Sequence, residues 1–137
     1  MWVIFALFSA LFAALTSILA KIGLEDVNST LAVALRTIIV LALAWAMVFV
    51  TGAQGGIASI SRRTATFLVL SGIATGLSWL CYFRALQMGP ASKVIPIDKS
   101  SVVFGMILAF IVLKEVFTLK AAIGGALITI GTFVLIF

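Results

Sequence analysis

Five long apolar runs, separated by short polar stretches, constrain the fold of this chain more than any other feature. The hydrocarbon core of a bilayer is about 30 Å thick and takes about 20 apolar residues per helix. Runs of about that length cover residues 2–20, 30–50, 65–85, 93–113 and 120–137. With 64% hydrophobic and 9% charged residues, the chain has too few polar residues to form the surface of a water-soluble protein. The sequence therefore predicts an all-α, polytopic membrane protein, a single domain of residues 1–137 with five helices in the lipid bilayer.

The first apolar run is predicted to be a spanning helix rather than a signal peptide. Met1, Trp2 and Val3 carry no side-chain charge, and the run is longer than the apolar region of a signal peptide.

Turn-forming residues mark the ends of the predicted helices. Side-chain oxygens that can cap a helix N-terminus gather between the first two runs, at Glu25, Asp26, Asn28, Ser29 and Thr30. Thr51-Gly52 is expected to end the second helix, and Gly89-Pro90 to break the chain after the third. We expect Pro96 to mark a helix break within the first turns of the fourth helix, where its missing N–H costs least.

The composition argues against several classes of function. The chain has no histidine, four acidic residues and one cysteine, Cys81, so it lacks the residues for a catalytic triad, a zinc site or a carboxylate metal cage. We therefore expect no enzyme activity, no metal and no cofactor. The net charge of +5 comes from scattered basic residues rather than one patch, and no nucleic-acid partner is expected.

Lys and Arg are almost evenly shared between the two sides of the membrane. The side that holds the N-terminus has Arg62, Arg63, Lys114 and Lys120, and the opposite side has Lys21, Arg84 and Lys93, with Arg36 and Lys99 close to it. Cytoplasmic loops normally carry the excess of basic residues, so this balance does little to determine the orientation in which the chain inserts into the membrane. Either both orientations are populated, or a small bias sets one.

Three charged residues lie a turn or two within the apolar runs, away from their ends. Arg36 and Lys99 have long side chains that can extend to the headgroups and leave only their stems in hydrocarbon. Asp98 is too short for that, so it needs a polar cavity, a proton, or an ion pair with a neighbouring Lys or Arg.

Weakly polar faces on the predicted helices offer two interpretations. Asp98 and Ser101 share a face of the fourth helix, and Trp79 and Tyr82 lie on a stripe of the third that ends beside Arg84. Converging faces of this kind would enclose a small-molecule site. Alternatively, their small and hydroxyl residues serve only helix packing. Two stripes of small residues are also expected to serve helix packing or a dimer contact. One is Gly72 and Gly76 on the third helix, and the other is Ala121, Gly125 and Thr129 on the fifth.

The stretch from Trp79 to Glu115, WLCYFRALQMGPASKVIPIDKSSVVFGMILAFIVLKE, resembles the EamA-type signature of the drug/metabolite transporter superfamily. The matching features are an aromatic-rich helix ending in Arg-Ala-Leu, the Gly-Pro-Ala-Ser turn, the Val-x-Pro-Ile helix entry and the closing Leu-Lys-Glu. Most relatives carry two repeats and ten helices. This chain is similar to the single-repeat, five-helix members of bacteria and archaea, which implies a multi-pass protein of the cytoplasmic (inner) membrane.

The resemblance implies half of a transporter. Two repeats of opposite orientation would surround a central cavity, supplied by an antiparallel homodimer or by a heterodimer with a second five-helix chain. A small polar or amphipathic metabolite, with or without an anionic group, would cross by alternating access. A non-transporting scaffold or accessory subunit is the alternative.

By residue match, the resemblance places candidate cavity residues in the third and fourth helices: Trp79, Tyr82, Arg84, Pro96, Asp98 and Lys99. Asp98 would bind a coupling proton or a substrate cation, Lys99 or Arg36 a substrate carboxylate or phosphate, and the rings would stack.

Overall fold

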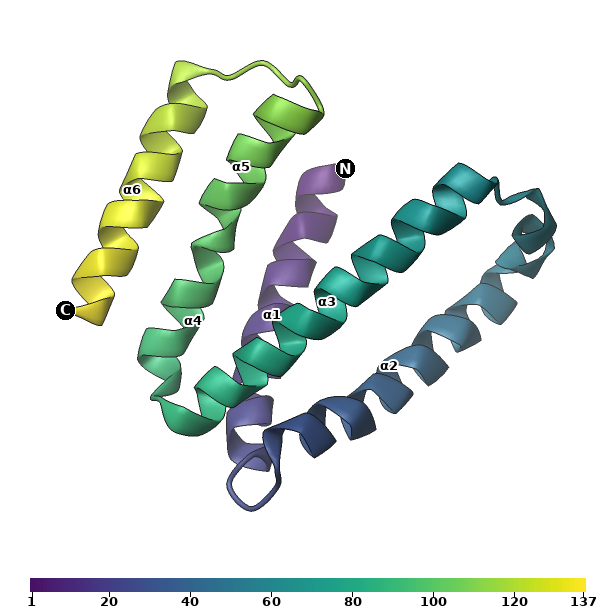
Figure 1. Cartoon of the computed structure of the whole chain (residues 1–137), viewed down its shortest axis with the longest axis horizontal. Coiled ribbons are helices and arrows are strands. Elements are labelled where there is room, and N and C mark those ends of the chain that lie inside the picture. The colour runs from purple at the N-terminus through teal and green to yellow at the C-terminus, as the bar shows by residue number, and fades with distance from the viewer. The chain divides into compact units, whose positions relative to one another are not determined.

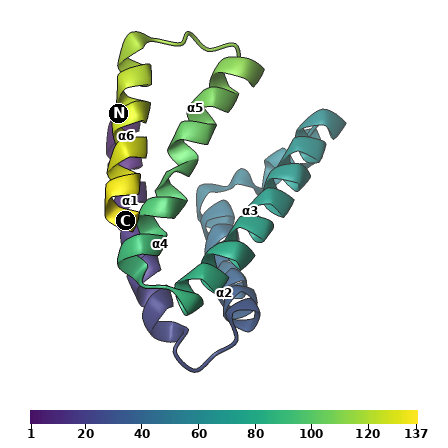
Figure 2. The same cartoon turned by 60° about the vertical axis from the view of Figure 1, so that its left-hand side comes forward.

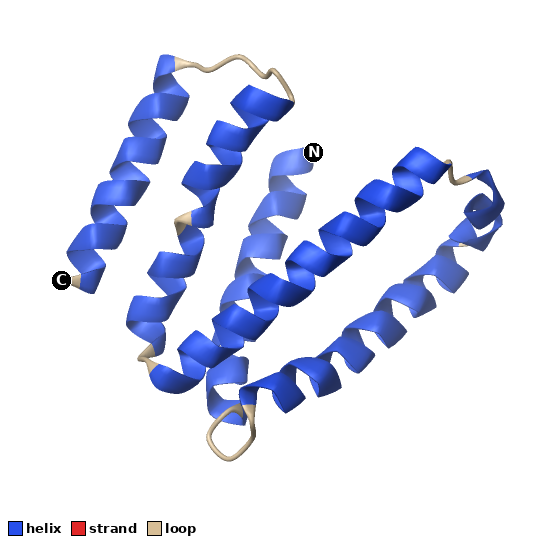
Figure 3. Cartoon of the chain, in the orientation of Figure 1, coloured by secondary structure: helices blue, strands red, loops and turns tan.

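The computed structural model describes residues 1–137 and consists of helices without strands. Its elements are α1 (Trp2–Gly23), α2 (Ser29–Thr51), the 3-10 helix η1 (Ala53–Ser59), α3 (Arg62–Met88), α4 (Ala91–Lys99), α5 (Ser101–Val112) and α6 (Leu119–Ile136) (Figures 1 and 3). Five segments are long and apolar enough to cross a membrane, with Ala91–Val112 counted as one. The predicted fold class, an all-α protein with five candidate spans, is confirmed.

The predicted capping residues close the ends of α2. Asn28 precedes the helix, and its Oδ1 accepts hydrogen bonds from the backbone N–H groups of Thr30 at 2.9 Å and Leu31 at 3.4 Å. These bonds satisfy donors that have no partner within the helix. At the other end Gly52 has φ 70°, a left-handed conformation that glycine adopts without steric penalty, and its N–H donates to Phe49 O. Both predicted ends of α2 are confirmed.

The fourth apolar run forms two helices, α4 and α5, with an interruption at Ser100 (Figure 3). Pro96 lies inside α4, because that helix begins at Ala91, two residues earlier than predicted. Without an N–H, Pro96 cannot bond the carbonyl of Ser92. The regular helix is interrupted four residues later, where the Ser100 N–H bonds Ile97 O at 3.1 Å and the Ser100 hydroxyl donates to the same oxygen at 2.6 Å. Ser100 therefore marks the observed discontinuity.

The chain divides into two compact units, residues 1–18 with 88–137, and residues 19–87. In the first unit α6 packs against α4 and α5, and Figures 1 and 2 show α6 beside α4. Two hydrogen bonds join them: Lys93 Nζ donates to Ile136 O at 2.8 Å, and the Thr132 hydroxyl donates to Pro96 O at 3.5 Å. These bonds hold the C-terminal end of α6 beside the first turns of α4.

The second unit has its core at one end, where α3 finishes and α2 begins. Its buried apolar side chains are Leu24, Val33, Phe83 and Leu86. Two bonds fasten this end: Lys21 Nζ donates to Leu86 O at 2.5 Å, and Gln87 Nε2 donates to Val27 O at 2.9 Å. The Lys21 ammonium thus lies at the C-terminal end of α3, where the helix dipole favours positive charge. The Gln87 bond places the start of α2 level with the end of α3.

Most other large apolar side chains of the spanning helices are exposed in the single chain. In water such a surface would drive aggregation, whereas lipid chains are as apolar as leucine and solvate it. This distribution fits helices whose outer faces meet lipid or another membrane subunit.

Replacing Leu86 by alanine is expected to destabilise the second unit by about 2 kcal/mol, because the side chain is fully buried and its loss leaves a cavity. Leu70→Ala is the matched control, since Leu70 lies on the same helix and is 55% exposed. Unfolding of the purified proteins in detergent, followed by circular dichroism, measures both. Equal stability of the two variants would contradict the described core.

Candidate functional site

Arg36 of α2 is held against two aromatic rings of α3. Its guanidinium carbon, Cζ, lies 4.5 Å from the ring centroid of Trp79 and 5.2 Å from that of Phe83. The two rings are four residues apart, which places them on one face of α3. Phe83 is only 2% exposed, so one wall of this arrangement belongs to the core of the unit. Both distances are within the range of cation–π attraction.

The guanidinium is at the depth of its own backbone rather than at the end of the helix. Arg36 is seven residues beyond Ser29, or about 10 Å along α2 at a rise of about 1.5 Å per residue. Phe83 and Trp79 are five and nine residues before Met88, or about 8 and 13 Å from the end of α3. Because the two helix ends are level, the arginine lies beside the rings and does not extend along α2 toward the headgroups.

No acidic residue neutralises Arg36. The sequence contains no Asp or Glu between Asp26 and Asp98, and Arg36 forms no ion pair and donates no hydrogen bond within the chain. An arginine at the bilayer centre costs about 2.5–3.5 kcal/mol on insertion scales, and a desolvated cation–π contact returns about 2 kcal/mol. The rings offset part of that cost, and the N–H donors of Arg36 remain available to an acceptor from outside the chain.

Phe83 is a member of this group that the sequence analysis missed. The prediction chose Trp79 and Tyr82 because each carries a polar atom, and Phe83 has none. The available signal was spacing: Phe83 follows Trp79 by four residues, the interval that aligns side chains on a helix. Tyr82 is the neighbour of this pair, and its ring stands edge-on to Phe83 with centroids 6.3 Å apart.

Arg84 lies in a different setting at the end of α3. Its side chain is exposed and donates to Gln87 Oε1 at 3.0 Å, while Gln87 donates in turn to Val27 O. Arg84 therefore supports the polar junction between α3 and the segment before α2, and does not contact the rings that hold Arg36.

Asp98 and Lys99 pair with each other in α4. Lys99 Nζ lies 3.3 Å from Asp98 Oδ2, and the two side chains are 52% and 33% exposed, respectively. Ser101 begins α5 and is exposed, while Pro96 is half-buried. The face of α4 and α5 that packs against α6 carries Ile97, Ser100 and Val103, so Asp98 and Ser101 lie on another face of these helices.

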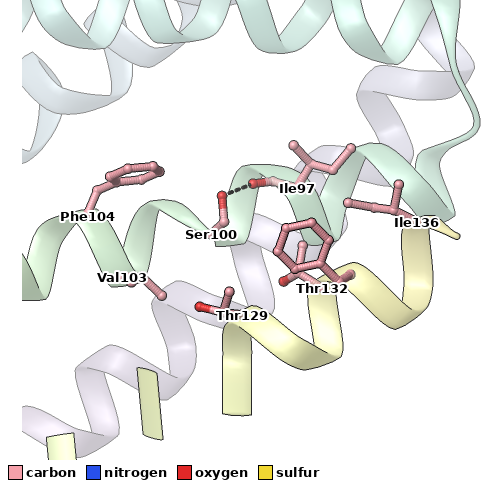
Figure 4. A pocket seen from close by; sticks show the side chains of 8 residues that line it. Ile97, Ser100, Val103, Phe104, Thr129, Thr132 and Ile136 are labelled. Atoms are coloured by element: carbon pink, nitrogen blue, oxygen red, sulfur yellow. Dashed lines mark hydrogen bonds between the residues drawn. The ribbon is translucent and has the colours of Figure 1, made fainter. Parts of the chain in front are cut away.

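A cavity of about 270 Å³ lies between α6 and the α4–α5 segment (Figure 4). Its polar atoms are three hydroxyls, and each donates to a backbone carbonyl: Ser100 to Ile97 at 2.6 Å, Thr129 to Gly125 at 2.9 Å and Thr132 to Ile128 at 2.9 Å. The remaining lining is apolar, from Ile97, Val103, Phe104, Phe133 and Ile136. The cavity contains none of the charged or aromatic residues predicted to bind a solute.

The two small-residue stripes lie in different environments. Gly125 of α6 is buried and faces the side chain of Met106 on α5, and Ala121 and Thr129 line the same contact. This stripe packs two helices of one chain together. At Gly72 and Gly76 of α3, by contrast, no atom of their own unit lies within 4 Å of the position a Cβ would take, so no helix of that unit approaches them closely.

Five candidate spans define a polytopic α-helical membrane protein. The chain belongs to the EamA-like transporter family, which matches residues 1–137. It is similar to a protein of Sinorhizobium sp named "Uncharacterized transporter in cobO 3'region", at 44% identity over 134 residues. That match covers 98% of this chain and 95% of the relative. No solved structure matches. The resemblance seen in the sequence is thereby confirmed, and family membership favours a transporter over an enzyme.

The pairing of Asp98 with Lys99 predicts a measurable coupling between them. Asp98→Asn and Lys99→Met each leave one charge unpaired, so each is expected to destabilise the protein, and the double variant is expected to recover about 1 kcal/mol. The free energy of unfolding in detergent is measured for the parent, the two single variants and the double variant, which together form a double-mutant cycle. Strictly additive effects would show that the pair does not couple.

Proposed function

We propose that this chain is one half of a membrane transporter that moves a small polar or amphipathic metabolite across the cytoplasmic membrane of a bacterium or archaeon. The observation that carries the proposal is the odd number of candidate spans, five, in a chain of the EamA-like transporter family. The match over 95% of a relative named as a transporter indicates that a unit of this length also occurs there.

An odd number of spans supports assembly from two chains. Five spans place the start and end of the unit on opposite sides of the membrane, and inverted repeats around a midplane site are a common transporter architecture. Two copies inserted in opposite directions would supply both repeats. The near-even division of Lys and Arg between the two sides supports dual insertion. A heterodimer with a second five-helix chain of fixed orientation is the other form of this proposal.

The discontinuity at Ser100 supports a solute or coupling site in α4. Transporter sites often form where a spanning helix is interrupted, because freed backbone groups and nearby charges face a cavity there. Asp98 and Lys99 directly precede the interruption, and Ser101 follows it. In this proposal Asp98 accepts a coupling proton or contacts a substrate cation, and rocking of the two halves exposes the site to each side in turn.

Faces left uncovered in the single chain support a partner in the membrane. The Gly72 and Gly76 face of α3 has no helix of its own unit close against it. Small residues at such a face let a second helix approach closely.

A non-transporting scaffold or accessory subunit is the alternative function. Such a subunit would need no charged group in α4, and Asp98→Leu would then leave its function unchanged. The interruption of the span beside a charged pair favours the transporter.

Membrane orientation tests the inverted dimer. A single cysteine introduced at Gln54 in a Cys81→Ser background is expected to react in about half of the molecules with a membrane-impermeant thiol reagent applied outside intact cells. Gln54 is exposed in η1, so labelling after permeabilisation should be complete. Labelling of nearly all or nearly none of the molecules would exclude the self-sufficient homodimer and direct the search to a second chain.

Solute flux tests the role of Asp98. In proteoliposomes exchanging a mixture of labelled metabolites, Asp98→Asn is expected to lower the flux at least about tenfold, as loss of a group required for coupling does. Glu115→Gln is the control, because Glu115 follows α5 in an exposed connection outside the span. If Asp98→Asn transports as well as the control, Asp98 has no coupling role.

A further inference from the structure

We propose that Arg36, Trp79 and Phe83 form a binding site for an anionic group of the transported solute, a carboxylate or a phosphate. The inference rests on the proposed transport function and names the class of its substrate. The sequence left Arg36 and Lys99 as equal candidates for an anion, and the contacts of each residue now separate them.

Lys99 has its charge matched within the chain, whereas Arg36 does not. Lys99 lies 3.3 Å from the Asp98 carboxylate, so an incoming anion would compete with that partner. No acidic residue occurs on α2 or α3. The guanidinium of Arg36 lies over the rings of Trp79 and Phe83 and interacts electrostatically with Tyr82. Of the two basic residues that lie a turn or two within the apolar runs, Arg36 is therefore the one without an acidic partner.

The hydrogen-bonding capacity of Arg36 is also unused. A guanidinium has five N–H donors in a planar fork that matches the oxygens of a carboxylate or phosphate. None of these donors is bonded to an acceptor of the chain. Aromatic faces attract the positive charge, but they are much weaker hydrogen-bond acceptors than an oxygen atom. An anion would complete the coordination that the chain leaves open.

The site is held in place before any ligand binds. Phe83 is almost fully buried, and the Gln87 bond to Val27 O keeps the end of α3 level with the start of α2. Trp79 is half-buried, and its ring lies 4.5 Å from Arg36 Cζ. A fixed guanidinium beside apolar walls binds an anion more tightly than a mobile one in water, because less ordering is needed and the local dielectric is lower.

Two sources could supply the same anionic oxygens, a dissolved solute or a lipid headgroup. The site lies about 10 Å along α2 from its start, deeper than a headgroup phosphate at the surface of the hydrocarbon core. This depth favours the solute, and the experiment separates the two by lipid composition.

Trp79 provides a direct reporter of binding. In a Trp2→Phe, Trp45→Phe background it is the sole tryptophan of the chain. The protein in nanodiscs of phosphatidylcholine is titrated with inorganic phosphate and with acetate, at constant ionic strength set with chloride, while Trp79 emission is recorded. We expect a saturable change for at least one anion and none for tetramethylammonium.

Two substitutions of Arg36 and one control define the origin of the signal. Arg36→Leu is expected to weaken anion binding at least about tenfold, and Arg36→Lys to retain part of it, because lysine keeps the charge but loses the planar fork. Arg63→Leu is the matched control, since Arg63 also lies over a ring of α3, Phe67 at 6.0 Å, but at the exposed start of the helix. Its titration should match that of the parent, and Arg36→Lys keeps the test valid if Arg36→Leu does not fold.

Each other outcome overturns the proposal. An absent or non-saturable response, or equal affinities for the parent and both Arg36 variants, would show that the arginine binds no anion. A Trp79 emission change produced by phosphatidylglycerol alone, with no further response to either anion, would assign the site to lipid. Flux by the parent protein separates this inference from the proposed function: transport without anion binding contradicts the site alone, and anion binding without transport of any solute contradicts the transporter.

Discussion

Hydrocarbon supplies no hydrogen-bond partner to a polar group, and this property of the bilayer governs where each polar atom of the chain lies. Backbone groups are bonded within helices, and several hydroxyls inside the spans donate to the carbonyl four residues earlier, as in Ser17 to Ala13 at 2.9 Å and Thr37 to Val33 at 2.7 Å. Asp98 and Lys99 balance each other's charge. Arg36, by contrast, has no acidic partner, and the rings of Trp79 and Phe83 lie against its guanidinium. Its unmet donors make it the most informative residue for function.

The same constraint explains why the single chain buries so little. Without a hydrophobic drive between helices in lipid, association depends on close packing and on polar contacts. The chain concentrates both at a few places: Gly125 against Met106 between α5 and α6, and the bonds of Lys21 and Gln87 at the end of α3. Elsewhere the spanning helices present apolar surface outward, which suits a unit that meets lipid on one side and a partner on the other.

The sequence predicted those features that depend on local composition. Run lengths determined the five spans. The side chain of Asn28 and the left-handed backbone of Gly52 determined the ends of α2, because capping requires only neighbouring residues. Features that depend on residues far apart in the sequence could not be predicted from it. Nothing local to Arg36 indicates that Trp79 and Phe83 lie opposite it, and nothing local to Gly125 indicates that it faces α5 rather than a second subunit. The interruption at Ser100, four residues beyond Pro96, likewise reflects bonding along the whole α4–α5 segment.

Solute flux through tandem fusions tests the central proposal, that two copies of opposite orientation together form the transporter. Because one copy has five candidate spans, two copies joined by a short polar linker are forced into opposite orientations, and one added spanning helix between them forces the same orientation. The account predicts transport by the direct fusion in proteoliposomes and none by the fusion with the added helix, at equal amounts of folded protein. Equal transport by both fusions, or transport only by the same-orientation pair, would contradict it.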